Sequence, residues 1–203
     1  MDRKPVKAKS YANIAIIKYW GKEDAKQMVP STSSISLTLE NMYTETSLSP
    51  LPADATAHEL YIDGEFQNPA EQAKIGAVID GLKPANEAGF VRVDTSNNMP
   101  TAAGLSSSSS GLSALVKACN QYYDLGLSQE ELAQKAKFAS GSSSRSFFGP
   151  LAAWDKESGE IYKVQTDLKL AMIMLVLNDK QKPVSSREGM KRCMETSTNF
   201  KEW

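Results

Sequence analysis

Five consecutive serines, Ser106 to Ser110, lie between two glycines and directly before a helical pattern. The apolar residues that follow recur at intervals of three and four, which predicts one face of an amphipathic helix: Leu112, Leu115, Val116 and Cys119. The first N–H groups of a helix lack partners within it, and with the helix dipole they favour a bound anion. Gly104 and Gly111 would let the backbone approach such an anion closely. The stretch predicts a phosphate-binding loop, with a plain serine helix cap as the alternative.

A pair of lysines beside aromatic residues, Lys18 and Lys22 in "NIAIIKYWGK", is a second chemical feature. Their ammonium groups could hold phosphate oxygens as compact positive charges. The alternative is an edge strand whose lysines extend along apolar surface into solvent. Taken alone, this stretch favours the edge strand.

Two further Ser-rich stretches each carry an arginine. "ASGSSSRSFFGP" contains Arg145, and "PVSSREGM" contains Ser185, Ser186 and Arg187 at a predicted helix start. A planar guanidinium suits two-pronged recognition of a carboxylate or phosphate. A glycine helix end with a surface arginine, and a plain serine N-cap, are the respective alternatives. Three Ser-rich helix entrances with two arginines and two lysines together indicate a phosphorylated, acidic small molecule as the ligand.

The composition excludes several other classes of function. Lys and Arg total 23 against 24 Asp and Glu, a net charge of −1 that argues against nucleic acid as a partner. With one histidine, and two cysteines that form neither a metal-ligand pair nor a disulfide framework, no residue is assigned as a metal ligand. His58 is interpreted as a solvated loop residue. No apolar run reaches membrane-spanning length and no cleavage site follows the basic N-terminus, so we expect a cytoplasmic protein without a membrane partner.

The elements that must position these residues alternate between strand and helix patterns. Residues 33–40 and 42–49 predict two strands, Asp63 with the following glycine predicts a hairpin turn, and Ser128 with Glu131 fits a helix capping box. Other stretches predict a helix ("EQAKIGAVIDGL"), a strand ("GFVRVDTS"), a strand pair ("GPLAAW" and "EIYKVQ"), a buried strand ("LKLAMIMLVLN") and a last helix ("SSREGMKRCMETSTNFKEW"). Early hairpins followed by mixed elements predict an α+β fold rather than a doubly wound parallel one.

Four stretches, in this order, resemble the mevalonate diphosphate decarboxylases: "NIAIIKYWGK", "PTAAGLSSSSSG", "SGSSSRSFFGP" and "SSREGM". These enzymes are a branch of the superfamily of galactokinase, homoserine kinase, mevalonate kinase and phosphomevalonate kinase. The resemblance runs from about Ser10 to Trp203, and "KYWGK" with "SGSSSRS" is specific to the decarboxylase branch. It implies a carboxy-lyase of isoprenoid biosynthesis that uses ATP and Mg²⁺ to convert 5-diphosphomevalonate into isopentenyl diphosphate, carbon dioxide, ADP and phosphate. It also implies a homodimer for the full-length protein.

The resemblance further implies how the chain is divided. The family joins an N-terminal half like ribosomal protein S5 to a ferredoxin-like C-terminal half, so residues 1–183 would form the ATP- and substrate-binding domain and residues 184–203 would begin the next. The family's catalytic aspartate lies in a C-terminal "DAGPN" motif that these 203 residues lack. We therefore expect a C-terminally truncated chain that binds ligands but has no turnover alone, with no carboxylate in the matching stretches to serve as a base. A small-molecule kinase that stops at phosphorylation, and a non-catalytic nucleotide-binding fragment, stay open as alternatives.

Each matching residue acquires an expected role from the resemblance. The ATP phosphates would be wrapped by Gly104, Leu105, Ser106, Ser107, Ser108, Ser109 and Ser110. Arg145 would hold the substrate carboxylate, steadied by Asn13, and both are assigned to catalysis with Lys18 and Ser186. The substrate pocket would further include Tyr19, Trp20, Gly21, Lys22, Lys74, Ser140, Gly141, Ser142, Ser143, Arg187 and Met190. Tyr19 and Lys22 would contact the diphosphate, and Ser186 with Arg187 the diphosphate or the transferring phosphate.

Overall fold

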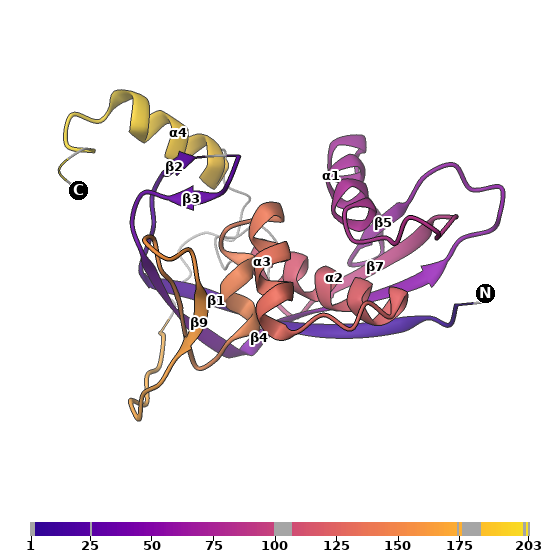
Figure 1. Ribbon diagram of the computed structural model, residues 1–203, viewed down its shortest axis with the longest axis horizontal. Helices are drawn as coiled ribbons and strands as arrows, with labels where there is room; N and C mark the ends of the chain where they lie inside the picture. The colour runs from indigo at the N-terminus through magenta and orange to yellow at the C-terminus, as the bar shows by residue number, and fades with distance from the viewer. Residues whose placement is uncertain are drawn as a thin grey trace.

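The computed structural model describes residues 3–24, 26–99, 107–173, 175, 184–200 and 202, apart from the side chain of Arg187. Its main sheet contains β1 Val6–Ile17, β4 Ser34–Pro50, β5 Glu59–Ile62, β6 Glu65–Phe66, β7 Val91–Asn97, β8 Leu151–Trp154 and β9 Ile161–Val164. The strand order is β6-β5-β7-β4-β8-β9, and β1 pairs with β4. The pairs are antiparallel except for β5 with β7, so the sheet is mixed. With helices packed across it (Figure 1), the predicted α+β fold is confirmed.

The longest strands, β1 and β4, pair antiparallel along most of their length. The sequence predicts two strands at residues 33–40 and 42–49, whereas the structure has one continuous strand. The register changes from Tyr11 opposite Tyr43 to Ala12 opposite Leu39, which leaves residues 40–42 as a bulge. The polar residues Glu40 and Asn41 look like a turn in the sequence, but β1 pairs on both sides of them and keeps the strand together.

Four helices and one short 3₁₀ helix accompany the sheet in the described part of the chain. They are α1 Pro69–Asp80, α2 Ser107–Tyr123, α3 Gln129–Ala139, the 3₁₀ helix η1 Ser143–Phe147, and α4 Ser186–Thr196. The predicted apolar face of α2 is confirmed, because its four residues are all buried, with Leu112 the most exposed at 5%. Ser128 and Glu131 form the predicted capping box at the start of α3. The main core lies between α2, α3 and the sheet, where Leu115 and Val116 join the same cluster as Leu48.

The predicted hairpin turn at Asp63 and Gly64 is confirmed. Asp63 and Gly64 connect β5 to β6 with positive φ angles of 50° and 85°, which a two-residue hairpin turn requires.

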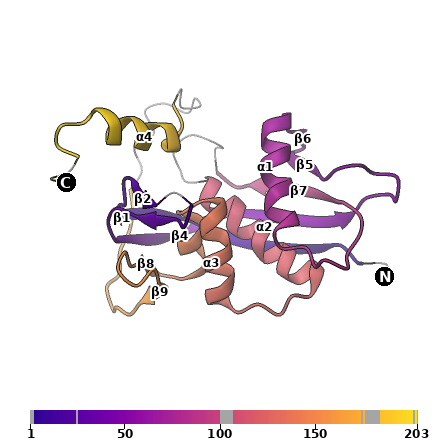
Figure 2. The same ribbon diagram turned by 45° about the horizontal axis from the view of Figure 1, so that its top comes forward.

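A separate two-stranded ribbon, β2 Lys22–Asp24 with β3 Val29–Pro30, lies beside α4 (Figures 1 and 2). The N-terminus and the C-terminus lie at opposite ends of the molecule.

Two sequence interpretations are wrong. The run "LKLAMIMLVLN" predicts a buried strand, yet its described residues, 168–173 and 175, lie in no strand, and Ile173 and Leu175 are 86% and 84% exposed. Residues 174 and 176–178 lie outside the described residues. An apolar run forms a strand when a neighbour supplies hydrogen bonds, and β9 pairs with β8 alone among the described strands. His58 is buried rather than solvated: its Nδ1 accepts from the Val91 N–H at 2.9 Å, and its Nε2 lies 3.2 Å from Asp80 Oδ1.

No helix in the described part of the chain has the length and apolar character needed to cross a membrane.

Candidate active site

A cleft of about 1010 Å³ lies between the end of β1, α1, β7, the start of α2 and α4. It gathers residues from all four chemical stretches of the sequence. Of the residues assigned to the site, those that line it are Asn13, Lys18, Tyr19, Trp20, Lys22, Lys74, Ser107, Ser108, Ser140, Gly141, Ser142, Arg145, Ser186 and Met190. Tertiary folding therefore brings residues 13 and 190, which are far apart in the sequence, to one hollow.

Arg145 is the most unusual group in this cleft, because its charge is almost completely buried. It lies in η1 with 2% of its surface exposed, and its Nε and Nη1 donate to the hydroxyls of Ser36 and Ser34 on β4, at 2.5 and 2.9 Å. No carboxylate in the described ranges forms an ion pair with it. Burial lowers the pKa of the guanidinium to about 10, which still leaves it charged at neutral pH. A buried cation without an anionic partner is costly, so its position in a cleft indicates an anionic ligand.

Asn13 stands beside Arg145 but does not hold it. The amide Nδ2 donates to the Ser142 carbonyl at 2.9 Å and to Ser146 Oγ at 2.7 Å, so Asn13 holds the segment that carries Arg145 and not the guanidinium itself. That Asn13 steadies Arg145 stays a prediction. These two bonds fix the amide orientation and leave Oδ1 buried, without a hydrogen-bond partner among the described residues. Because Asn13 lines the cleft, Oδ1 is available to accept a hydrogen bond from a ligand.

The segment from Lys18 to Lys22 forms the aromatic and basic side of the cleft. Residues 18–21 lie in no strand or helix, yet Tyr19 is buried. The Lys18 ammonium lies 4.9 Å from the Trp20 ring centroid, and the Lys22 ammonium lies 3.1 Å from Met28 Sδ. Both lysines therefore extend over neighbouring apolar groups while lining the cleft.

The start of α2 shows which serine hydroxyls can reach a ligand. Ser107 and Ser108 line the cleft, whereas Ser109 and Ser110 are fully buried. The Ser110 hydroxyl pairs with Thr44 Oγ1 at 2.7 Å. The expectation that Gly104 to Ser110 wrap the ATP phosphates is therefore corrected for the hydroxyls of these two residues, and that of Ser110 anchors the helix to β4 instead. Gly104, Leu105 and Ser106 lie outside the described residues.

Two other assigned residues do not line the cleft. The Ser143 hydroxyl is buried and bonds the carbonyls of Ala136 and Ser140 at 2.8 and 2.6 Å, as a cap at the end of α3. Gly21 has a φ of 128°, and a Cβ there would meet Phe200 and the Ser31 hydroxyl within 3.0 Å. A glycine is needed here because Phe200 of the C-terminal segment packs closely against it, which the sequence pattern does not reveal.

Helix α4 brings the last stretch to the cleft. Ser185 caps it by accepting from the Glu188 N–H at 3.2 Å, so the helix start is confirmed and this serine forms the plain N-cap given as the alternative to an anion site. Ser186 and Met190 line the cleft, and α4 passes close to Trp20, since a Cβ at Gly189 would lie 3.7 Å from that ring. The side chain of Arg187 lies outside the described part of the structure.

Sequence reasoning missed one wall and two carboxylates. The wall comes from alternate residues of β5 and β7: Leu60, Ile62, Val93, Thr95 and Asn97. Period-two alternation in "ELYI" and "VRVDTSN" was the available signal, but it cannot say which face borders a cleft. Glu71 and Glu188 also line the cleft, so the expectation that no matching stretch supplies a carboxylate is wrong for Glu188 in "SSREGM". Glu71 lies 3.3 Å from the Lys74 ammonium, and Glu188 lies 3.7 Å from the Arg192 guanidinium.

The residues present fit a metal that arrives with phosphate. Within the described ranges no group of three or more His, Cys, Asp or Glu side chains could hold a metal ion. Magnesium is commonly held by one or two carboxylates together with substrate phosphates rather than by a complete protein cage. The hydroxyls of Ser107 and Ser108 and the carboxylates of Glu71 and Glu188 are the oxygen donors of the cleft side chains that suit this arrangement.

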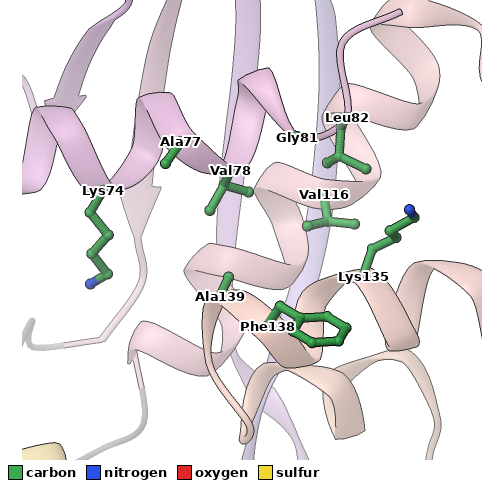
Figure 3. A pocket seen from close by; sticks show the side chains of 9 residues that line it. All are labelled: Lys74, Ala77, Val78, Gly81, Leu82, Val116, Lys135, Phe138 and Ala139. Atoms are coloured by element: carbon green, nitrogen blue, oxygen red, sulfur yellow. The ribbon is translucent and has the colours of Figure 1, made fainter. Parts of the chain in front are cut away.

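A second hollow of about 420 Å³ lies between α1, α2 and α3 (Figure 3). Its walls are apolar apart from Lys74 and Lys135, which Figure 3 shows at opposite sides of Val78, Val116 and Phe138. It shares Lys74 and Ala139 with the large cleft. None of the Ser-rich stretches lines it beyond Ala139, so the chemical groups of this chain converge in the large cleft.

Comparison with known proteins identifies the family. A protein-family sequence model, described as the diphosphomevalonate decarboxylase-like N-terminal domain, matches residues 10–163. The diphosphomevalonate decarboxylase of Saccharomyces cerevisiae is 34% identical over 94% of this chain and 54% of its own length. The chain thus spans about half the length of such relatives.

Solved structures agree with this result. The mevalonate pyrophosphate decarboxylase of Streptococcus pyogenes is 67% identical with a TM-score of 0.92, covering 100% of this chain and 64% of its own. The Staphylococcus aureus mevalonate diphosphate decarboxylase is 38% identical with a TM-score of 0.89, covering 98% and 62%. A further relative, described as MDDEF in complex with MVAPP, AMPPCP and magnesium, is 36% identical with a TM-score of 0.84, covering 98% and 63%. Because the family model matches more than half of the chain, the chain belongs to the diphosphomevalonate decarboxylase-like N-terminal domain family.

Proposed function

We propose that this chain supplies the nucleotide- and substrate-binding part of an enzyme that decarboxylates 5-diphosphomevalonate with ATP and Mg²⁺, giving isopentenyl diphosphate. The observation that carries the proposal is Arg145, a buried guanidinium without a carboxylate partner in the described structure, in the same cleft as the start of α2. One feature suits a carboxylate and the other suits phosphates. A ligand pair of a phosphorylated hydroxy acid and a nucleotide satisfies both.

Each wall of the cleft has a defined task in this proposal. The first N–H groups of α2, with the hydroxyls of Ser107 and Ser108, bind the ATP phosphates. Arg145 binds the substrate carboxylate, and the Oδ1 of Asn13 accepts from a substrate hydroxyl. Tyr19 and Lys22 contact the diphosphate. Glu71 and Glu188, with the hydroxyls of Ser107 and Ser108, would hold Mg²⁺, which would neutralise phosphate charge.

The charge distribution of the cleft suits loss of phosphate with carbon dioxide. After phosphorylation of the tertiary hydroxyl, phosphate departure builds positive charge on the tertiary carbon. The cleft must then hold anions while keeping nucleophiles away from that carbon. Arg145 offers no lone pair, and the hydroxyls of Ser34 and Ser36 are already accepting hydrogen bonds from it. Ser140 and Ser142, whose hydroxyls lie 3.1 Å apart, line the same side, and Ser186 and Met190 approach from α4.

The proposal extends to the surroundings of the site. We place the ligand-binding domain in residues 1–183 and the beginning of a second domain in residues 184–203. We also propose that the whole enzyme is a cytoplasmic homodimer, a state that sedimentation of the purified full-length protein would test.

Calorimetric titration of the chain with Mg·ATP and with 5-diphosphomevalonate tests the binding function. We expect saturable binding of both ligands, and absence of substrate binding would contradict the proposal. Assay of the full-length enzyme for carbon dioxide and ADP then tests the chemistry. Equal amounts of the two products would support decarboxylation, whereas ADP without carbon dioxide would favour a kinase that stops at phosphorylation.

The serine assignments allow a sharper test of the nucleotide site. Replacing Ser107 and Ser108 by alanine should weaken ATP binding by about 1–2 kcal/mol for each hydroxyl that contacts a phosphate, while leaving the fold intact. Replacing Ser109 and Ser110 is the matched control, because both side chains are buried away from the cleft. The control should lower the free energy of unfolding instead. Unchanged ATP affinity in the Ser107 and Ser108 variant would return these residues to the role of helix cap.

A further inference from the structure

Three side chains form a continuous row at one end of the cleft. The Arg145 guanidinium lies 5.6 Å from the centroid of the Tyr19 ring. The other neighbour of Tyr19 is Trp154, whose ring packs edge-on at 5.2 Å and 73°. Trp154 is the member of the row that does not line the cleft, so it contacts no ligand there.

Trp154 is the rigid member of this row. It ends strand β8, it is fully buried, and its backbone is paired with Ser34 of β4. Ser34 is also the residue whose hydroxyl accepts from Arg145 Nη1 at 2.9 Å. One cross-strand pair thus supplies both a hydrogen-bond acceptor for the guanidinium and a wall for the tyrosine.

Tyr19 depends on tertiary contacts for its position. Residues 18–21 lie in no strand or helix, so no repeating backbone hydrogen bonds fix the ring. Gly141 packs against both rings: a Cβ there would overlap the Tyr19 hydroxyl and lie 2.9 Å from Trp154 Cζ3. The tyrosine therefore occupies a slot that Trp154 and Gly141 define together.

We propose that Trp154 is a positioning residue for the cleft: its ring holds Tyr19 against Arg145 and so sets where the tyrosine hydroxyl and the guanidinium meet an anionic substrate. This inference rests on the proposed function for its effect on 5-diphosphomevalonate, but the packing of Tyr19 is independent of any ligand. The indole Nε1 has no hydrogen-bond partner in the described part of the structure, so the ring acts through its aromatic edge. Phenylalanine at position 154 should therefore preserve most of this contact with Tyr19, whereas leucine should not.

Substitution of Trp154 by phenylalanine and by leucine tests the proposal through ligand affinity. In Trp154→Leu the dissociation constant for 5-diphosphomevalonate, measured by calorimetry, should rise about tenfold, with the constant for Mg·ATP unchanged. Trp154→Phe should restore affinity to within about threefold of the wild type. Leu48→Ala is the matched control, because Leu48 is a fully buried core residue that does not line the cleft. It should lower the free energy of unfolding without changing either affinity, and equal affinity losses in Leu48→Ala and Trp154→Leu would overturn the proposal.

A ligand-free measurement separates this inference from the proposed function. Protein labelled with 3-fluorotyrosine gives a ¹⁹F resonance for Tyr19, assigned by its loss in Tyr19→Phe. In Trp154→Leu this resonance should move toward the position of the unfolded protein, while the signal of Tyr61, which packs against Phe66 on the far hairpin, stays in place. A Tyr19 signal unchanged in Trp154→Leu would overturn the positioning role even if substrate binds. If the wild type fails to bind 5-diphosphomevalonate but the resonance shifts, the proposed function fails and the packing role stands.

The double variant Tyr19→Leu with Trp154→Leu tests whether Trp154 acts through Tyr19. If it does, loss of the indole should cost no further substrate affinity once the tyrosine ring is gone. Additive losses in the double variant would contradict the proposal.

Discussion

The two sides of the cleft that carry arginines are built in opposite ways. Residues 143–148, which include η1, are all buried, and the charge of Arg145 is surrounded by hydroxyls and a tyrosine ring. No residue of α4 whose exposure is described is buried, and its charges form solvent-exposed pairs one turn apart, such as Arg192 with Glu188 at 3.7 Å.

This difference indicates which side of the cleft an anionic ligand would stabilise more. Solvent-exposed ion pairs contribute little, because water and salt screen them. A buried guanidinium lowers stability unless something compensates it, and two serine hydroxyls compensate only part of the lost hydration. A substrate carboxylate would complete the compensation at Arg145, whereas Lys191 and Arg192 of α4 already pair with Glu195 and Glu188.

Arg145→Lys should separate the two walls most clearly. A lysine ammonium cannot make the planar two-pronged contact, so affinity for 5-diphosphomevalonate should fall by about 2 kcal/mol, or roughly 30-fold. The affinity for Mg·ATP should stay nearly constant. Arg192→Lys on α4 is the matched control and should change neither constant by more than about twofold. Equal losses for both ligands in Arg145→Lys, measured by calorimetry, would count against a carboxylate contact.

The pH dependence of substrate binding should follow the Arg145 guanidinium. Burial lowers the pKa of Arg145 from its ordinary value to about 10, so the cation is present below pH 10 and lost above it. Affinity for 5-diphosphomevalonate should therefore hold between pH 7 and 9 by calorimetry, and fall as the pH rises through about 10. Because the folded pKa lies below the unfolded one, the stability cost of burying this charge is fully present below pH 10 and shrinks above it. An affinity loss beginning below pH 8 would implicate another group.

Ser36→Ala should lower the stability of the protein more than its affinity for the substrate. The substitution leaves the Arg145 Nε–H buried without its acceptor, which should lower the free energy of unfolding by about 2 kcal/mol. Urea unfolding followed by circular dichroism measures this quantity. Ser197→Ala, at the exposed end of α4, should change it by less than about 0.5 kcal/mol. A similar loss in both variants would mean that the Ser36 hydroxyl has no special role.

The two cysteines should report the same contrast without affecting ligand binding. Cys119 on α2 is fully buried, and desolvation raises the pKa of its thiol to about 12, whereas Cys193 on α4 is partly exposed. At pH 8 its thiolate fraction is then about a thousandfold below that of an ordinary cysteine with a pKa of 9.0. A thiol reagent should modify Cys193 rapidly in the native protein and Cys119 only after unfolding. Cys193→Ser should abolish the rapid phase, and its persistence there would show that Cys119 is accessible.

Local signals in the sequence were sufficient where one element settles the outcome. The helical spacing after the serine run, the capping box at Ser128 and the turn at Asp63 and Gly64 all depend on contacts within a few residues. The four chemical stretches were also recognisable, because their residue types are unusual together. Short-range chemistry of this kind is written into neighbouring residues and needs no knowledge of the rest of the chain.

Tertiary structure decided which of those residues face the ligand. Ser107 and Ser110 look alike in the sequence, but one lines the cleft and the other bonds Thr44 of β4. The acceptors of Arg145 come from a strand more than a hundred residues away, and Asn13 bonds Ser142 and Ser146 instead of the arginine. His58 is buried, and its Nδ1 accepts a hydrogen bond from a backbone N–H of β7. The sequence determines what each side chain can do, and burial against distant strands determines which of its atoms are still available to a ligand.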